Sequence, residues 1–290
     1  MEPEEEAVRK IGVIMSPQEI RFGGAADAPL LGELHRPDGE GPFPVVIGVH
    51  GGAWLRGHRH DLRHWGRFLA DHGIALFSID YALATKGPSF PQNLADVRAA
   101  VQFVLDEGAG FGLDADRIGI LGASAGAHLA ALTALGGGAS RLGPGFSSDL
   151  HKRLKVLVGV YGVYDLRSHW QEDLAKNHPP GQDSTVRMLG ADPPADPQLF
   201  VDASPYWQAR YDSAPLKSLI IYGDADTAVS ADQSRRFEQA LHQARLFARS
   251  LVIPGAGHFW FSDEPLDANA SYTGAIAPRL LRFLQQHLVG

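Results

Sequence analysis

The hydrophobic residues of this chain fall into short apolar runs separated by longer segments of mixed polarity. Runs such as 45–49 and 156–160 are almost continuously apolar, which is typical of strands buried on both faces of a sheet. The runs at 18–22 and 30–35 are predicted to be edge strands joined by a turn. The predicted strands are therefore 18–22, 30–35, 45–49, 74–79, 118–121, 156–160, 219–222 and 250–253.

Between several of these runs, apolar residues recur at steps of three and four, which is the spacing of one helix face. Leu94, Val97 and Val101 share such a face. The predicted helices are 62–72, 93–105, 127–135 and about 268–288. Strands that alternate with helices indicate the α/β class, with a mostly parallel eight-stranded sheet and helices on both faces. The length of the chain suits a single domain, 1–290.

One segment departs from this alternation. Residues 166–211 lie between two predicted strands and are rich in proline, aspartate, tryptophan and histidine. The segment is too long for an ordinary connection between elements. We expect a small inserted cap over the carboxyl ends of the strands, where open α/β sheets bind ligands. A surface excursion with no role in binding is the alternative.

The strongest chemical signal is the G-x-S-x-G motif at 122–126, with Ser124 at its centre. The motif lies between a predicted strand and an alanine- and leucine-rich predicted helix, which is the strand–turn–helix setting that a nucleophile elbow requires. Gly122 and Gly126 are expected to let strand and helix approach closely. We therefore predict that Ser124 is a nucleophile, with the N–H groups of a helix N-terminus directly after it.

A serine hydroxyl needs a base to remove its proton, and the base works best when a carboxylate orients it. His258, in the loop after the last predicted strand, is the candidate base. Asp224 and Asp226 follow the preceding predicted strand and are both candidate acids. Spacing alone does not choose between them, because either side chain could reach the imidazole from one turn.

The residues at 50–54, His-Gly-Gly-Ala-Trp, directly follow a buried strand. A glycine-containing loop in this place supplies backbone N–H donors for a developing oxyanion. We predict an oxyanion hole formed by the N–H groups of Gly52, Ala53 and Ala125.

Other aromatic and histidine residues near these loops have competing interpretations. Trp54 and Phe259 are candidates for an apolar substrate pocket, with packing of the loops against the core as the alternative. His50 is expected to shape the oxyanion loop, and His128 to be a hydrogen-bonded core histidine.

A cluster of histidines superficially suggests a metal site. His58, His60 and His64 lie close together in the sequence. Three arginines crowd the same segment and would repel a cation, so we expect a solvated helix entrance and no metal. No cofactor is expected either.

Composition narrows the function further. The net charge of -7, with no stripe of lysine and arginine, argues against a nucleic-acid partner. No apolar stretch approaches the ~20 residues that span a bilayer, and residues 1–6 are acidic where a secretory signal would be basic. We therefore expect a cytoplasmic protein without a membrane partner, and leave a homodimer open. The lack of cysteine excludes disulfides and a cysteine nucleophile.

Together these motifs resemble the α/β-hydrolase superfamily, and within it the carboxylesterase branch related to hormone-sensitive lipase and to feruloyl-esterase-like enzymes. The likeness runs from about 45 to 258. In such esterases the acid is usually the second aspartate of a Gly-Asp-x-Asp loop, so the resemblance favours Asp226. Asp224 would then hold the loop through backbone hydrogen bonds. One departure is Ala53, which stands where the hormone-sensitive-lipase branch usually has a third glycine.

The expected function is that of a serine hydrolase that cleaves short-chain or aryl carboxylic esters through an acyl-enzyme, with a small-molecule ester as its partner. The His-Gly-Gly-x-Trp and Ser-Ala-Gly-Ala-His stretches are also similar to kynurenine formamidases, so an arylformamidase-type amide hydrolase is the alternative. A catalytically silent ligand binder on the same fold is a further alternative.

Overall fold

The computed structural model of the protein describes residues 16–136, 142, 149–176, 183–210, 215–264, 266 and 271–290. The start of the chain, parts of the 166–211 segment and the beginning of the predicted last helix lie outside the described residues. In the ranges that are described, no helix is both long enough and apolar enough to cross a bilayer.

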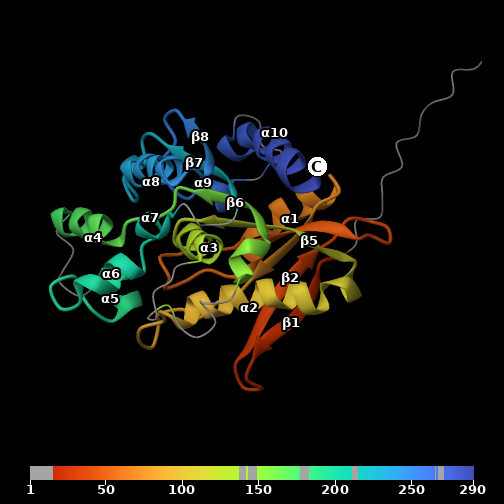
Figure 1. Cartoon of the computed structure of the whole chain (residues 1–290), viewed down its shortest axis with the longest axis horizontal. Coiled ribbons are helices and arrows are strands. Elements are labelled where there is room, and N and C mark those ends of the chain that lie inside the picture. The colour runs from red at the N-terminus through yellow and green to blue at the C-terminus, as the bar shows by residue number, and fades with distance from the viewer. Residues whose placement is uncertain are drawn as a thin grey trace, which may run out of the picture.

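Eight strands form a single sheet in the order β1-β2-β4-β3-β5-β6-β7-β8 (Figure 1). The ladders from β4 through β8 are all parallel, whereas β2 pairs antiparallel with both β1 and β4. This confirms the predicted mostly parallel, eight-stranded sheet. The strands are β1 (Gln18–Gly24), β2 (Pro29–His35), β3 (Phe43–Val49), β4 (Ala75–Ile79), β5 (Leu113–Ala123), β6 (Leu154–Val160), β7 (Lys217–Gly223) and β8 (Phe247–Ile253).

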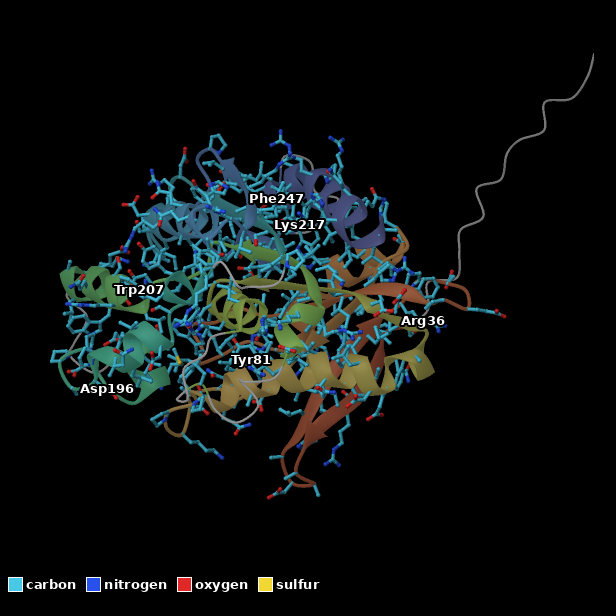
Figure 2. The ribbon with its side chains drawn as sticks, viewed as in Figure 1. Arg36, Tyr81, Asp196, Trp207, Lys217 and Phe247 are labelled. Atoms are coloured by element: carbon cyan, nitrogen blue, oxygen red, sulfur yellow. The ribbon has the colours of Figure 1, made fainter. Side chains whose placement is uncertain are left out.

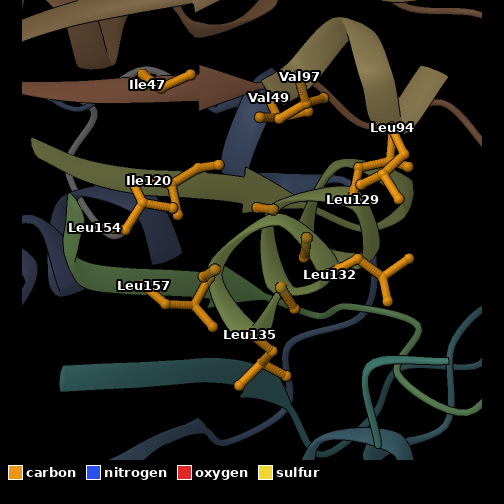
Figure 3. Packing of buried hydrophobic residues seen from close by; sticks show 14 of the residues in the cluster. Ile47, Val49, Leu94, Val97, Ile120, Leu129, Leu132, Leu135, Leu154 and Leu157 are labelled. Atoms are coloured by element: carbon orange, nitrogen blue, oxygen red, sulfur yellow. The ribbon is translucent and has the colours of Figure 1, made fainter. Parts of the chain in front are cut away.

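Helices cover both faces of this sheet, as predicted. The main helices are α1 (Arg63–Ala70), α2 (Gln92–Glu107), α3 (Ala125–Leu135), α8 (Ala231–Gln243) and α10 (Tyr272–Leu284). Buried side chains of α2, α3 and α8 belong to one hydrophobic cluster, and those of α1 and α10 to a second. Figure 3 shows part of the first cluster, with Leu94 and Val97 of α2, Leu129 of α3, and Val49 and Ile120 of the sheet among its buried side chains.

Helix α8 was not predicted from the sequence. Its buried face includes Gln233 and Ser234 beside Phe237 and Leu241, so half of the face is polar and the helical spacing of apolar residues is weak. Short 3-10 turns and the remaining short helix complete the fold outside the insertion: Arg59–Leu62, Gly108–Phe111, Asp149–Arg153 and α9 (Trp260–Asp263), with a π-helical turn at Gln285–Val289 after α10.

In the described part of the segment between β6 and β7 lie four short helices: α4 (Leu166–Ala175), α5 (Ser184–Leu189), α6 (Pro197–Asp202) and α7 (Pro205–Gln208). Figure 1 shows α4, α5 and α6 gathered at the left end of the molecule. Aspartate side chains cap the N-termini of three of these helices: Asp165, Asp183 and Asp196 each accept a hydrogen bond from a backbone N–H of the first turn. The assignment of this segment as a cap of the single domain stays a prediction.

The turn between β5 and α3 is closely packed against the end of β3. A Cβ atom on Gly126 would lie 2.1 Å from the carbonyl oxygen of Val49, and one on Gly122 would lie 2.3 Å from the carbonyl oxygen of Gly126. Neither distance is compatible with a side chain. The prediction that these two glycines permit the close approach of strand and helix is therefore confirmed.

Because of this contact, a single methyl group added at Gly126 should destabilise the folded protein strongly. Gly126→Ala should lower the free energy of unfolding by at least about 2 kcal/mol, because the backbone of β3 or α3 must shift to admit it. Gly110→Ala is the matched control, since a Cβ there meets no atom within 4 Å, and its effect should stay within about 0.5 kcal/mol. Urea unfolding of both variants measures the difference. Equal effects would show that the elbow tolerates a side chain.

Candidate active site

Ser124 occupies the sharp turn between β5 and α3. Its backbone has a φ of 54° and a ψ of -120°, a conformation that residues with a side chain rarely adopt. Its N–H donates to the carbonyl oxygen of Val160 at 2.9 Å, which ties the turn to the end of β6. The strained conformation is thus held by surrounding structure and presents the hydroxyl at the carboxyl edge of the sheet.

The His258 ring lies between Ser124 and Asp226. Its Nε2 is 3.0 Å from the Oγ of Ser124, and its Nδ1 is 2.6 Å from the Oδ2 of Asp226. The Asp226 side chain is almost fully buried, and its Oδ1 accepts the backbone N–H groups of Ala228 and Val229, both at 2.9 Å. These bonds fix the carboxylate, which in turn fixes the orientation of the imidazole.

Asp224, the other candidate acid, has a different partner. Its Oδ1 accepts the backbone N–H of Gly255 at 2.7 Å, in the loop that leads to His258. A backbone bond from Ala225 to Ala256, 3.1 Å long, joins the same two loops. The structure therefore places Asp226 on the ring, while Asp224 holds the two loops together through a backbone hydrogen bond.

Two aromatic side chains contact the His258 ring. The ring of Tyr161, which directly follows β6, lies 4.3 Å from it between centroids, and the ring of Phe259 lies 4.6 Å from it. Phe259 is 52% exposed, whereas Tyr161 is buried, and burial raises the pKa of its hydroxyl. Tyr161 was not predicted as a site residue, although its place directly after a predicted strand was a usable signal.

The predicted oxyanion loop, residues 50–54, has an unusual backbone. Gly52 has a φ of 114°, and Ala53 and Trp54 follow with φ values of 55° and 58°, in the left-handed region. Gly52, Ala53 and Ala125 all line the cleft beside Ser124. Ala125 is the first residue of α3, so its N–H has no acceptor within the helix. The structure thus brings together the backbone segments predicted to supply oxyanion donors.

His50 packs beneath this loop. Tyr81, labelled in Figure 2, stacks on the imidazole at 4.3 Å between ring centroids, and its hydroxyl donates to the His50 carbonyl oxygen at 3.0 Å. The Nδ1 of His50 is 2.7 Å from the carbonyl oxygen of Gly51, and burial lowers the pKa of the ring. These contacts fit the expected shaping of the loop.

Trp54 is 1% exposed and extends away from solvent. Its Nε1–H donates to the Nδ1 of His128 at 3.1 Å, and the Nε2–H of His128 donates to the Ala203 carbonyl oxygen at 2.8 Å. His128 is thus a hydrogen-bonded core histidine, as predicted, and it links the oxyanion loop to the inserted segment. Trp54 packs the loop against the core; its contact with substrate stays a prediction, as does that of Phe259.

The histidines at 58 and 60 belong to the 3-10 turn before α1, and His64 to the first turn of α1; their rings have different partners. The Nε2 of His58 accepts a hydrogen bond from Arg59 Nη1 at 3.0 Å. The Nε2 of His60 is 3.2 Å from a Glu33 oxygen, and the Nε2 of His64 is 3.1 Å from the Phe261 carbonyl oxygen. The segment is less solvated than expected, because Arg59 is buried against Asp80 and Glu19. Among the described residues, no three or more His, Cys, Asp or Glu side chains are grouped to hold a metal ion.

A cleft of about 730 Å³ opens above Ser124 and His258. Its wall includes His169 and Asp173 of α4, and Lys176, which directly follows α4. The sequence analysis identified the segment as a candidate cap but did not single out these side chains, because no motif marks them.

The buried position of His128 predicts a specific pH dependence of stability. Burial lowers the pKa of this imidazole from 6.5 to about 4, so the unfolded chain takes up a proton before the folded protein does. The contribution of the neutral His128 ring to the free energy of unfolding is complete above pH 6.5 and is lost as the pH falls towards 4. The free energy of unfolding of the parent should fall by up to about 3 kcal/mol more than that of His128→Gln over this range.

Urea unfolding at several pH values between 7 and 4 measures this difference. Glutamine retains an acceptor for Trp54 and a donor for Ala203 but does not titrate. His72→Gln, at an exposed position near the end of α1, is the control and should keep the parental pH dependence. Parallel losses in the parent and His128→Gln would contradict the prediction.

Solved structures confirm the fold. Esterase 2 from Thermogutta terrifontis, phosphonylated by sarin, superposes with a TM-score of 0.75 at 20% identity, covering 96% of this chain and 98% of that chain. Its butyrate-bound form gives a TM-score of 0.72 at 21% identity, with 93% of each chain covered. These structures share the α/β-hydrolase fold predicted from the motifs.

Curated relatives carry esterase names. The probable carboxylic ester hydrolase LipM of Mycobacterium tuberculosis is 32% identical over 229 residues, covering 78% of this chain and 51% of the relative. Esterase LipQ of the same organism is 34% identical, covering 83% and 56%. A probable isoprenylcysteine alpha-carbonyl methylesterase, ICMEL1 of Oryza sativa subsp. japonica, is 37% identical, covering 81% and 55%.

The chain therefore spans little more than half the length of these relatives. The model of the BD-FAE family matches residues 33–241, which is most of the chain. The resemblance to feruloyl-esterase-like carboxylesterases is thus confirmed, whereas that to kynurenine formamidases stays a prediction. This chain belongs to the BD-FAE family.

Proposed function

We propose that the protein is a serine carboxylesterase that cleaves short-chain or aryl esters through an acyl-enzyme on Ser124. The observation that supports this most directly is the His258 ring, which is within hydrogen-bond distance of both Ser124 and Asp226. A hydroxyl, an imidazole and a carboxylate in this succession form the arrangement that activates serine for attack on a carbonyl. The esterase names of the relatives agree with this chemistry.

In the acylation step, Ser124 Oγ attacks the ester carbonyl carbon and its proton passes to His258 Nε2. Asp226 Oδ2 accepts a hydrogen bond from the Nδ1–H of His258 and stabilises the imidazolium that forms. The carbonyl oxygen becomes an oxyanion, for which the N–H groups of Gly52, Ala53 and Ala125 are the proposed donors. When the intermediate collapses, the Nε2 proton passes to the departing alkoxide, and the alcohol leaves.

Deacylation uses the same groups with water as the nucleophile. His258 takes a proton from the water as it attacks the acyl carbon, and the same proton then returns to Ser124 Oγ as the carboxylic acid leaves. No observation favours a formamide over an ester, so the amide-hydrolase activity stays a prediction. The small-molecule ester partner, the homodimer and the cytoplasmic location also stay predictions.

Removal of the nucleophile tests the proposal. Ser124→Ala should lower kcat on p-nitrophenyl butyrate by ~10⁶, because the remaining groups provide only oxyanion stabilisation and binding. A fluorophosphonate probe should label the parent and not the variant. Ser262→Ala removes another hydroxyl at the cleft and should stay within about tenfold of the parent. A Ser124→Ala protein with parental turnover would exclude this mechanism.

The two aspartates provide a matched pair of variants. Asp226→Asn keeps an oxygen for the N–H groups of Ala228 and Val229 but turns an N–H₂ towards His258, so kcat should fall by ~10⁴. Asp224→Asn keeps an oxygen that can accept the Gly255 N–H, so kcat should remain within about tenfold. Steady-state kinetics of both variants measures the contrast. A loss within tenfold in both variants would mean that Asp226 is not the carboxylate that orients His258.

A further inference from the structure

The cleft above Ser124 has walls of two kinds. Part of its lining is apolar or aromatic and includes Val163, Val229 and Phe259. Within the described part of the predicted cap, 166–211, the residues that line the cleft are polar and include His169, Asp173, Lys176 and Asp183. A cleft of about 730 Å³ is within the range that encloses a drug-sized ligand, so a short ester would leave much of it unfilled.

His169 of α4 is a buried imidazole with one unused nitrogen. The residue is 5% exposed, and its Nε2 faces the Oδ2 of Asp173 at 3.6 Å. Among the residues that the structure describes, none provides a hydrogen-bond partner for its Nδ1. Burial lowers the pKa of the ring, which keeps it neutral at pH 7. With the proton on the nitrogen that faces Asp173, Nδ1 carries a free lone pair.

Asp183 has a second unused acceptor. Its Oδ1 accepts the backbone N–H of Val186 at 2.8 Å and begins α5, whereas its Oδ2 is buried and has no partner within the described part of the chain. The residue is 5% exposed and lines the same cleft as His169. Its carboxylate is also close enough to Asp173 for the two charges to interact. An unpaired buried acceptor is costly, so both atoms favour a ligand that brings a donor.

We propose that His169 and Asp183 form a subsite that binds a hydroxyl group of the ester substrate. The inference rests on the proposed esterase function and names the class of ester that the cleft favours: one with a hydroxyl-bearing group away from the scissile bond. The lone pairs of Nδ1 and Oδ2 accept O–H donors, while the apolar wall at Val163 and Val229 takes the hydrocarbon part.

A neutral hydroxyl fits this subsite better than an ammonium group. Lys176 lines the same wall, with its Nζ 3.5 Å from the Oδ1 of Asp173 and 3.2 Å from the carbonyl oxygen of Ala228. Its positive charge offsets the negative charge of Asp173, so only Asp183 would attract an ammonium group, which would also have to give up its hydration. A hydroxyl donates a hydrogen bond without adding charge, and selectivity arises because an ester that lacks it leaves the acceptors unpaired.

The test compares esters that differ only in hydroxyl groups. Propyl phenylacetate is the reference; 2,3-dihydroxypropyl phenylacetate places hydroxyls on the alcohol part, and propyl 4-hydroxyphenylacetate places one on the acyl part. With the full chain, kcat/KM for at least one hydroxylated ester should exceed that for the reference by about tenfold, the worth of one hydrogen bond. The ester that is preferred shows which part of the substrate faces the subsite.

Two variants assign the preference to these residues. His169→Phe removes the lone pair, and Asp183→Asn retains the oxygen that begins α5 while replacing the unused acceptor by a donor. In each variant the tenfold ratio should fall towards one. His72→Phe, on the exposed surface at the end of α1, is the control and should keep the parental ratio. Labelling by a fluorophosphonate probe verifies that each variant is folded with a reactive Ser124.

The outcomes separate this inference from the proposed function. If the parent hydrolyses all three esters with a ratio near one, or both variants keep the tenfold ratio, the subsite is wrong while the esterase function stands. If the parent hydrolyses none of them and is not labelled by the probe, the proposed function itself fails, and the subsite with it.

Discussion

The candidate site depends on the close contact between the elbow at Ser124 and the end of β3. Gly126 faces the carbonyl oxygen of Val49 across a gap with no room for a methyl group, and the Ser124 N–H bonds to Val160 on the other side. Neighbouring strands thus hold the turn from both directions. Because the oxyanion loop starts where β3 ends, the same contact fixes its position relative to the hydroxyl of Ser124.

A second close contact sets the position of the imidazole. The strands β7 and β8 are parallel neighbours, so the loops that follow them emerge side by side. A Cβ on Gly223 would lie 2.0 Å from the carbonyl oxygen of Ala256, which shows how tightly these loops pack. Asp224 then bonds to Gly255 across the gap. Asp226 and His258 are therefore brought together by two loops that pack and hydrogen-bond to each other independently of these two side chains.

The elbow, the loop at 50–54 and the position of His258 could be predicted from the sequence, because each follows a strongly apolar strand and has glycines close by. The sequence left Asp224 and Asp226 open, because a choice between residues two positions apart depends on loop geometry; the family resemblance favoured the one that contacts the ring. The polar wall at His169 and Asp183 was not foreseen, since the inserted segment has no regular periodicity. The α8 helix was missed because Gln233 and Ser234 dilute its apolar face.

The hydrogen bond from His128 to Ala203 has a consequence for how molecules enter and leave. Ala203 lies between α6 and α7, so this part of the inserted segment is anchored to the N-terminal part of α3 by a buried hydrogen bond. A rigid-body motion of the whole inserted segment would break this hydrogen bond and leave a buried ring nitrogen of His128 without a partner. The cost in free energy would be comparable to the effect of a typical destabilising substitution. Exchange of reactant and product is therefore easiest by local displacement of side chains at the rim, with the anchored half staying in place.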